Sequence, residues 1–329
     1  MSTAMAILAG KAATRIAGAV RRTPLRRSGE FSERLGADVW FKLENRQLTG
    51  SFKLRGASNR LLTLGEEQRD RGCVAASSGN HGAAVACAMQ RLGVRGAIFV
   101  PEKTSRAKVA KIEEYGGTVR YFGTDGLDTE QHARAYAREH GMFYLSPYND
   151  EEVIAGQGTI GIEILEDLHD VDAVFVAVGG GGLAGGVGSV LKHCDQRIRV
   201  IGCQPLASPV MARSIAAGKI LDLPSEATLS DGTAGGIEPD AVTFALNQRV
   251  VDDWVEVDEA DIARAMRRFM RDEGDVIEGA AGVAVAGLLQ HGARVAGKKV
   301  VVVICGGNIA DTTLAGIEGQ ELESKLRGP

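Results

Sequence analysis

The sequence predicts an α/β protein with parallel-rich sheets covered by helices, in which a smaller lobe is inserted into a larger one. Short apolar, β-branched runs alternate with segments of helical period over most of the 329 residues. Turns that contain glycine directly follow three of the apolar runs. Strands that are apolar on both flanks and separated by helices are typical of parallel sheets buried on both faces.

The order of these segments predicts the domain organisation. The predicted strands are 39–43, 97–100, 119–122, 173–178, 200–203 and 300–305, and the predicted helices are 83–92, 105–115, 158–168 and 261–270. Because 72–144 has the pattern of about four short β-α units, we expect a small lobe of residues 49–149, with a mobile core at about 72–145. Residues 1–48 and 150–329 then form the large, cofactor-binding lobe. An active site is expected between the lobes, at the carboxyl ends of strands.

Composition limits the classes of function. The net charge of −4 and the aromatic content of 5% favour neither nucleic-acid binding nor base stacking. The five cysteines are scattered and have no metal-ligand spacing, so neither a disulfide framework nor a zinc site is predicted. The first 24 residues predict an amphipathic helix and no signal core. No apolar run has the length of a membrane span, and a cytoplasmic location is expected.

Two segments place reactive side chains at the starts of helices. Ser51-Phe52-Lys53-Leu54-Arg55-Gly56 contains a lysine after an aromatic ring, and a desolvated lysine forms a Schiff base with an aldehyde. An isolated lysine is more often an ordinary surface residue. Ser77-Ser78-Gly79-Asn80-His81-Gly82 follows an apolar run, and amides at such a helix start favour an anion. The alternative interpretation of this segment is an ordinary capped turn.

Two further segments follow the longest apolar runs. Gly179–Leu183 has four consecutive glycines, whose amides suit a phosphate; the pattern matches neither the P-loop nor the dinucleotide fingerprint. A flexible linker is the alternative, which a position directly after a strand disfavours. Cys305-Gly306-Gly307-Asn308 places a neutral thiol at a strand end, although cysteine is also a common small buried residue.

Together, these four segments resemble the fold-type II pyridoxal-phosphate enzymes (tryptophan synthase β-like), and more narrowly the serine/threonine dehydratase and serine racemase family. The resemblance extends from about Thr23 to Ala310 and includes Ala155-Gly156-Gln157-Gly158-Thr159 and Glu278-Gly279-Ala280-Ala281-Gly282. It implies pyridoxal 5′-phosphate as cofactor, a small amino acid as substrate and a homodimer.

The resemblance also implies roles for individual residues. Lys53 would bind the cofactor covalently and act as general base on the substrate Cα. The residues implied for cofactor binding are Phe52, Lys53, Asn80, Gly179, Gly180, Gly181, Gly182, Leu183, Glu278 and Cys305, and those implied for substrate binding are Ser77, Ser78, Gly79, Asn80, His81 and Gly236. Cys305 would face the pyridine nitrogen and leave it largely unprotonated, which favours elimination over transamination. The role of Glu278 is not fixed by the resemblance.

The implied reaction is the dehydration and deamination of L-threonine, L-serine or both to a 2-oxo acid and ammonia. Ser78 stands where serine racemases carry a second base, so an isomerase is the first alternative. The second is a dehydratase for 3-hydroxyaspartate, a phenylserine-type compound or a hydroxyectoine-derived amino acid. The stretch 230–236, which is expected to border the side-chain pocket, has no basic residue and disfavours a diacid. The third alternative is a cofactor-binding protein without activity, which the retained lysine disfavours.

Two departures from the family pattern carry predictions. Several relatives bind a divalent cation through a glutamate at the turn that here is Gly202-Cys203-Gln204-Pro205, and a neutral amide is a poor ligand for a hard cation. We therefore predict no metal at this turn. No regulatory domain like that of biosynthetic threonine dehydratases is expected after Gly307, so a catabolic role is expected.

Overall fold

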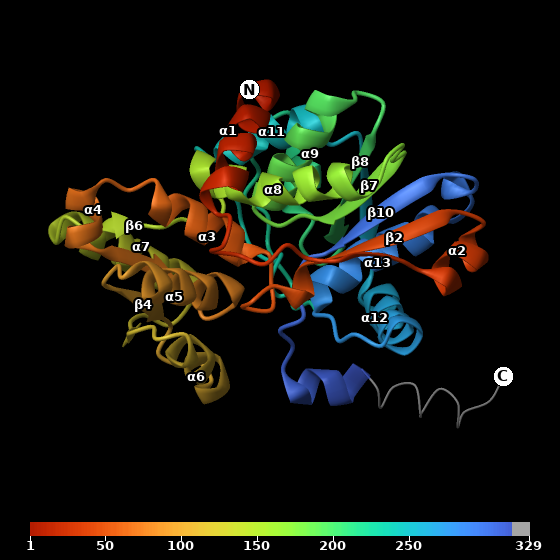
Figure 1. Cartoon of the computed structure of the whole chain (residues 1–329). Helices are drawn as coiled ribbons and strands as arrows, with labels where there is room; N and C mark the ends of the chain where they lie inside the picture. Colours follow the sequence, from red (N-terminus) through yellow and green to blue (C-terminus); the bar gives the residue numbers. More distant parts are fainter. Residues whose placement is uncertain (318–329) are drawn as a thin grey trace.

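The computed structural model describes residues 1–317, which form two β-sheets surrounded by helices (Figure 1). The six-stranded sheet has the order β1-β2-β10-β7-β8-β9, and the four-stranded sheet has the order β5-β4-β3-β6. The strands are β1 (Leu25–Arg27), β2 (Asp38–Leu43), β3 (Cys73–Ala76), β4 (Gly96–Val100), β5 (Val119–Tyr121), β6 (Phe143–Tyr144), β7 (Ala173–Ala177), β8 (Arg199–Pro205), β9 (Asp253–Val257) and β10 (Lys299–Ile304). All neighbouring strands are parallel except β1 and β2, which confirms the predicted fold class.

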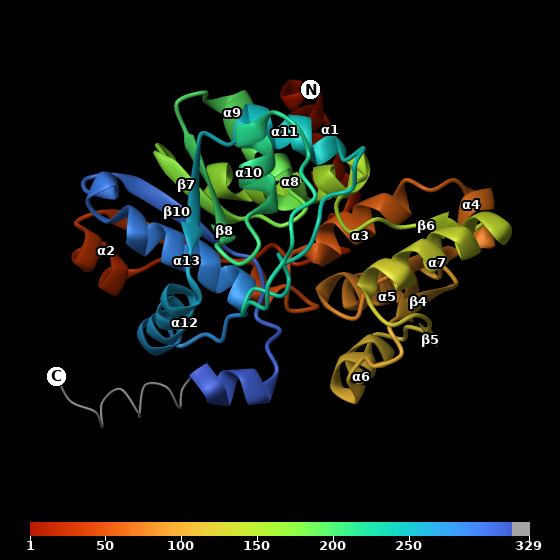
Figure 2. The ribbon, with the colours of Figure 1, turned by 180° about the vertical axis from the view of Figure 1, so that it is seen from behind.

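Helices cover both sheets. They are α1 (Ser2–Arg15), α2 (Gly29–Leu35), α3 (Lys53–Leu62), α4 (Glu66–Arg71), α5 (Asn80–Leu92), α6 (Arg106–Glu114), α7 (Gly126–Glu139), α8 (Glu151–Asp167), α9 (Gly182–Cys194), α10 (Val210–Ala217), α11 (Val242–Val250), α12 (Glu259–Glu273) and α13 (Gly279–His291), with short 3₁₀ turns η1 (Glu44–Arg46) and η2 (Gly292–Val295). Figures 1 and 2 show α8 and α9 on one face of the larger sheet and α12 and α13 on the other.

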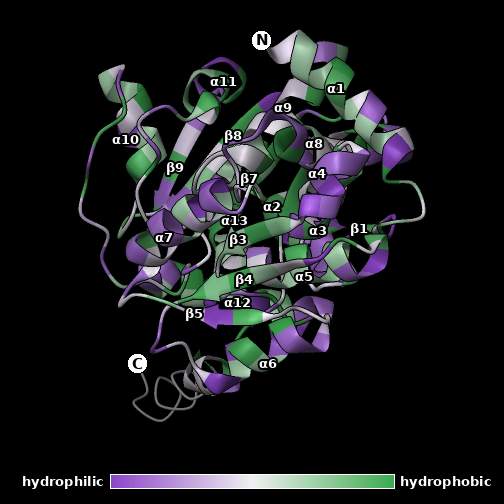
Figure 3. Cartoon of the chain, turned by 90° about the vertical axis from the view of Figure 1, so that its left-hand side faces the viewer, coloured by the Kyte–Doolittle hydropathy of each residue, from purple (hydrophilic) through white to green (hydrophobic). Residues whose placement is uncertain are grey.

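The two sheets lie side by side, each with its own group of helices (Figure 2). The central strands β3 and β4 are largely apolar, whereas the helix α6 alternates polar and apolar residues (Figure 3). The larger sheet is the centre of the main apolar core, and β10 is buried from Val300 to Ile304. The boundaries predicted for the two lobes stay a prediction.

Four strands, β1, β3, β6 and β9, are not among those predicted from the sequence, and each has a physical reason. β3 contains only four residues. β1 and β6 contain three and two residues, which is too short for a recognisable period. β9 is an edge strand with two acidic residues among its five, and only Val257 is buried, so it lacks the continuous apolar run of the central strands.

Helix α8 begins seven residues before the predicted start at 158, since its N-terminus is defined by a cap. The Asp150 carboxylate accepts the backbone N–H groups of Glu152 at 2.9 Å and Val153 at 3.1 Å. Gly156 then permits close packing, because a Cβ there would lie 2.6 Å from the Cα of Gly56 on α3. Helix α12 is capped in the same way, since the Asp258 carboxylate accepts the N–H of Asp261 at 2.7 Å.

A buried ionic cluster fixes α3 against the larger sheet and α8. Arg55 Nε donates to Glu44 at 2.8 Å, and its Nη1 donates to Glu163 at 2.6 Å. Lys42 of β2 pairs with the same Glu163 at 2.5 Å. Each buried charge therefore has an opposite partner, which offsets the cost of removing it from water. Because Arg55 is two residues from Lys53, the cluster also holds the start of α3.

The cysteines Cys73, Cys87, Cys194, Cys203 and Cys305 are all free thiols. Across the part of the chain that the structure describes, none of the helices combines the length and apolar character needed to span a bilayer.

Candidate active site

A cavity of about 600 Å³ opens at the carboxyl ends of β3, β7 and β10. The side chains and backbone of four chain segments meet there, although these segments are far apart in sequence. Every residue predicted for the site lines this cavity, namely Phe52, Lys53, Ser77, Ser78, Gly79, Asn80, His81, Gly179, Gly180, Gly181, Gly182, Leu183, Gly236, Glu278 and Cys305. The geometry thus gathers the predicted residues in one place, while their individual roles stay predictions.

Lys53 is the first residue of α3, and its amine faces the cavity. Lys53 Nζ donates to the carbonyl oxygen of Pro147 at 2.9 Å. The N–H of Phe52 donates to the carbonyl of Cys305 at 3.0 Å, which fixes the start of α3 to the end of β10. Burial lowers the pKa of Lys53 to about 8, against the opposing effect of the Cys305 and Glu278 charges. The amine therefore reaches its neutral, nucleophilic form far more readily than a surface lysine.

The tetraglycine turn leads from β7 into α9. Gly181 is the N-cap residue with φ of +83°, and no side chain caps the helix. A Cβ on Gly180 would lie 2.4 Å from Cδ1 of Tyr148, so any larger residue would displace that ring. The first-turn amides of α9 therefore stay available to an anion, and the helix N-terminus adds favourable partial charge.

A hydrogen-bonded network crosses the cavity from α5 to the segment after β10. Asn80 Nδ2 lies 2.9 Å from both carboxylate oxygens of Glu278, and the N–H of Asn308 donates to Glu278 Oε2 at 3.1 Å. Asn308 Nδ2 in turn donates to Asn80 Oδ1 at 2.6 Å. Burial raises the pKa of Glu278 to about 7, although the hydrogen bonds from Asn80 and Asn308 oppose the shift. Glu278 therefore changes charge near neutral pH.

The Ser77–His81 segment forms the start of α5. The N–H of Gly79 donates to Ser77 Oγ at 3.2 Å, which shapes the turn. His81 is buried, and its Nε2 contacts the carbonyl oxygen of Leu145 at 2.9 Å. Burial, together with the nearby Lys53 amine, lowers the pKa of His81 to about 3. The ring is therefore neutral at physiological pH and donates through Nε2, so it contributes shape and not positive charge.

Cys305 is the residue that follows β10, and it is buried with 2% of its surface exposed. Burial raises the pKa of the Cys305 thiol well above its ordinary value, and the Glu278 carboxylate adds to the shift. The group is therefore a neutral thiol and not a thiolate, in agreement with the neutral partner that the sequence predicts.

The cavity also contains residues that sequence reasoning did not assign to it. Tyr148 underlies the glycine turn, and its hydroxyl accepts the N–H of Glu238 at 2.9 Å. Lys108 and Lys111 reach the cavity from α6; Lys111 Nζ donates to Asn308 Oδ1. The helical period of 105–115 gave no signal for this, because the position of α6 depends on long-range packing.

The positions of Lys108 and Lys111 bear on whether the cavity disfavours a diacid substrate. Residues 230–236 contain no basic residue, as noted, but Asp231 in that stretch lies 3.5 Å from Lys108 Nζ. Positive charge therefore reaches the same region from the other sheet. The absence of a base in 230–236 does not by itself disfavour a diacid substrate.

Gln204 lies within β8 and not in a turn as expected from the sequence, and its side chain is bound to backbone groups. Its Nε2 donates to the carbonyl of Val178 at 2.9 Å, and its Oε1 accepts the N–H of Ala212 at 2.7 Å. Both ends of the amide thus link β8 to its surroundings. The prediction that this segment binds no metal stays a prediction.

Comparisons with known proteins agree with this geometry. The family model described as "Pyridoxal-phosphate dependent enzyme" matches residues 16–306. The L-threonine ammonia-lyase of Thermotoga maritima is 42% identical over 290 residues, which cover 88% of this chain and 72% of that protein. The catabolic L-threonine dehydratase of Escherichia coli K12 is 39% identical over 313 residues, covering 94% of each. Maize serine racemase superposes with a TM-score of 0.89 at 33% identity, covering 97% of this chain and 98% of the other.

Proposed function

The chain belongs to the pyridoxal-phosphate-dependent enzymes, and we propose that it is an ammonia-lyase that converts L-threonine, L-serine or both to a 2-oxo acid and ammonia. The observation that carries the proposal is the Lys53 amine, which faces a cavity between a glycine-lined helix start and a neutral thiol. The names of the relatives support threonine as a substrate. The racemase fold neighbour and the retained Ser78 keep an isomerase as the second candidate.

The residues of the cavity fit pyridoxal phosphate. The uncapped first turn of α9 suits its phosphate, and a lysine with a pKa of about 8 suits its aldehyde. When bound, pyridoxal phosphate supplies a conjugated ring that accepts the electron pair left at the substrate Cα after deprotonation. Cys305 would lie at the ring nitrogen and, as a neutral thiol, would not keep that nitrogen protonated.

Lys53 would act as the base. About one amine in ten is neutral at pH 7 for a group with a pKa of about 8, whereas fewer than one in a thousand is neutral at the ordinary lysine value. In the proposed reaction the Lys53 amine takes the Cα proton, and the β-hydroxyl gains a proton as it leaves, so that one proton and one hydroxyl are lost from the substrate as water. The released enamine rearranges to an imine, and a second water hydrolyses it to the 2-oxo acid and ammonia.

Two groups would orient the reactants. The start of α5, with Ser77, Ser78 and Gly79, would bind the substrate carboxylate through backbone amides and hydroxyls. The neutral His81 ring supplies no positive charge for this carboxylate. Asn80 would hydrogen-bond the ring oxygen, and Glu278 with Asn308 would hold the Asn80 side chain in place. Glu278 is thus proposed as a positioning residue.

The proposal is tested by measuring 2-oxo acid release from L-serine, D-serine, L-threonine, its allo form, 3-hydroxyaspartate and phenylserine. Release from L-threonine or L-serine, abolished in Lys53→Ala, supports it. D-serine that forms from L-serine faster than pyruvate forms would favour the isomerase. Activity on 3-hydroxyaspartate alone would point to Lys108 and Lys111 as the side-chain contacts, with Lys108→Ala/Lys111→Ala as the check.

The proposal extends to the assembly and the location of the protein. We propose a homodimer in the cytoplasm, which agrees with the family resemblance. Sedimentation velocity of the cofactor-loaded protein distinguishes a dimer from a monomer.

A further inference from the structure

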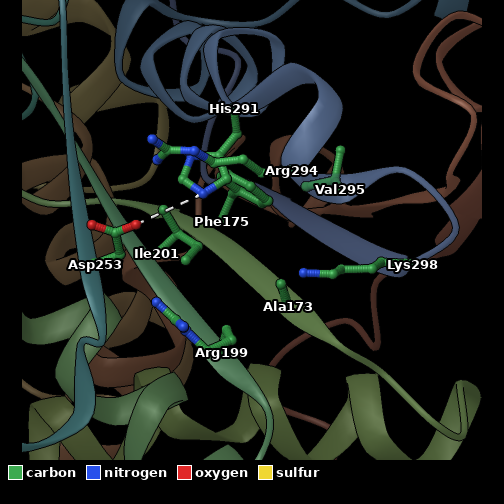
Figure 4. Close-up of a pocket in the computed structure, with 9 residues that line it drawn as sticks. All are labelled: Ala173, Phe175, Arg199, Ile201, Asp253, His291, Arg294, Val295 and Lys298. Carbon is green, nitrogen blue, oxygen red and sulfur yellow. Dashed lines mark ion pairs between the residues drawn. The ribbon is translucent and has the colours of Figure 1, made fainter.

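A second cavity, of about 380 Å³, lies at the opposite end of the larger sheet from the candidate active site (Figure 4). Ala173, Arg199 and Asp253, the first residues of β7, β8 and β9, line it, and Lys298 lines it just before β10 begins. The candidate active site uses the carboxyl ends of β7 and β10. The two cavities therefore lie at opposite ends of the same strands and are separate.

Positive charge converges on this cavity from separate elements. Arg199 comes from β8, Arg294 from η2 and Lys298 from the loop before β10. Figure 4 shows Arg199, Arg294 and Lys298 around this cavity. Within residues 1–317, none of these three side chains has a hydrogen bond or an ion pair. Like charges held near one another without partners repel, and a bound anion would offset that repulsion.

His291 also lines this cavity and lies within reach of these charges. His291 Nε2 lies 3.8 Å from the carboxylate of Asp253, which raises the pKa of the imidazole. The pKa of His291 is nevertheless lowered, first by burial and then by the separate charges of Arg294, Arg199 and Lys298.

Part of the wall of the cavity is apolar. Phe175 and Ile201 are buried, and the His291 ring packs edge-on against Phe175 with 5.4 Å between centroids. A low-dielectric wall strengthens the attraction between the cations and an anion. The carbonyl end of α13 lies here and itself attracts cations, which accounts for Arg294 after that helix but not for Arg199 or Lys298.

We propose that this cavity binds a compact polyvalent oxyanion, bearing phosphate groups or several carboxylates, through Arg199, Arg294 and Lys298. Arg199, Arg294 and Lys298 carry three positive charges, and Asp253 carries one negative charge, so the cavity has an excess of positive charge. The chain as a whole has a net charge of −4. Arg guanidinium groups bind phosphate and carboxylate through paired hydrogen bonds, so two arginines favour such a ligand over a monovalent ion.

The test is isothermal titration calorimetry of the cofactor-loaded protein, in which bound cofactor blocks the glycine turn. Inorganic pyrophosphate and citrate are the two probes, with acetate at matched ionic strength as the monovalent reference. Saturable binding of either probe, but not of acetate, is expected, and the probe that binds more tightly identifies the ligand class. The exposed Arg294 and Lys298 allow a double variant, Arg294→Gln/Lys298→Gln, which should bind about tenfold more weakly or worse. The control is Lys219→Gln, which replaces an exposed lysine after α10 that does not line the cavity, and this variant should bind the probe like the wild type.

A second readout follows His291 directly. Binding of an anion should raise the pKa of His291 in an NMR titration, because it offsets the three cations that lower it. The proposal is overturned if neither probe binds saturably to the wild type, or if the double variant binds as tightly as the wild type. A His291 pKa that does not move when the probe is saturating would place the binding elsewhere and would also overturn it.

Discussion

Glu278 is a buried carboxyl group whose replacement by glutamine tests the electrostatics of the cavity. Burial raises its pKa from 4.5 to about 7, so between these values the folded chain keeps a proton that the unfolded chain has released. The contribution of Glu278 to the free energy of unfolding is therefore largest below pH ~4.5 and falls as the pH rises through ~7. At ~1.4 kcal/mol per pKa unit, the total loss is ~3 kcal/mol.

His81 contributes a pH dependence of the opposite sign. Its pKa is lowered from 6.5 to about 3, so its contribution to stability is present above pH ~6.5 and is lost as the pH falls. The two slopes oppose each other between pH ~4.5 and ~6.5, so the wild-type profile alone does not isolate Glu278. The difference between the wild type and Glu278→Gln removes the His81 contribution.

The assay is denaturant unfolding of the cofactor-free protein at a series of pH values. Relative to the wild type, Glu278→Gln should gain ~3 kcal/mol in unfolding free energy between pH ~4.5 and ~8.5. The control is Glu226→Gln, at an exposed carboxylate, which should follow the wild type at every pH. A difference between Glu278→Gln and the wild type that stays constant over this range would refute the reasoning.

Three further predictions concern the cofactor site and its support. The rate of pyridoxal-phosphate incorporation should rise with pH through about 8, because the neutral Lys53 amine attacks the aldehyde; a pH-independent rate in stopped-flow absorbance would contradict this. Gly180→Ala should weaken cofactor binding by about tenfold or more, since its Cβ would lie 2.4 Å from Tyr148, whereas Gly10→Ala, with no atom within 4 Å, should bind normally in a fluorescence titration. Arg55→Met should lower the free energy of unfolding by ~3–5 kcal/mol, because it leaves the buried Glu44 carboxylate without an ionic partner and leaves Glu163 with Lys42 alone; a loss below ~1 kcal/mol in denaturant unfolding would count against the ionic cluster.

Local sequence patterns were sufficient to predict the fold class and the gathering of the site. Long apolar runs become the central strands β7 and β10, because a strand buried on both faces needs apolar residues throughout. The segments that end those strands meet in space, since the carboxyl ends of parallel strands lie at one edge. The tetraglycine turn was found in this way, whereas the role of Lys53 was implied by the family resemblance.

Contacts that depend on long-range packing could not be predicted. Lys108 and Lys111 lie on α6. The helical period predicts which side of this helix is buried, but it does not predict which other segments lie near the helix. Their approach to Asp231 and Asn308 therefore had no local signal. The basic cavity around Arg199 was missed for the same reason, because its members come from three separate strand starts and a helix end.

The most direct test of the central claim is the identification of the lysine that binds the cofactor. The cofactor-loaded protein is reduced with borohydride, digested, and analysed by mass spectrometry, with Lys53→Ala as control. We predict that the pyridoxyl group is found on the peptide that contains Lys53 and is absent from the control. A pyridoxyl group on Lys111, which lines the same cavity, with Lys53 unmodified would contradict the account.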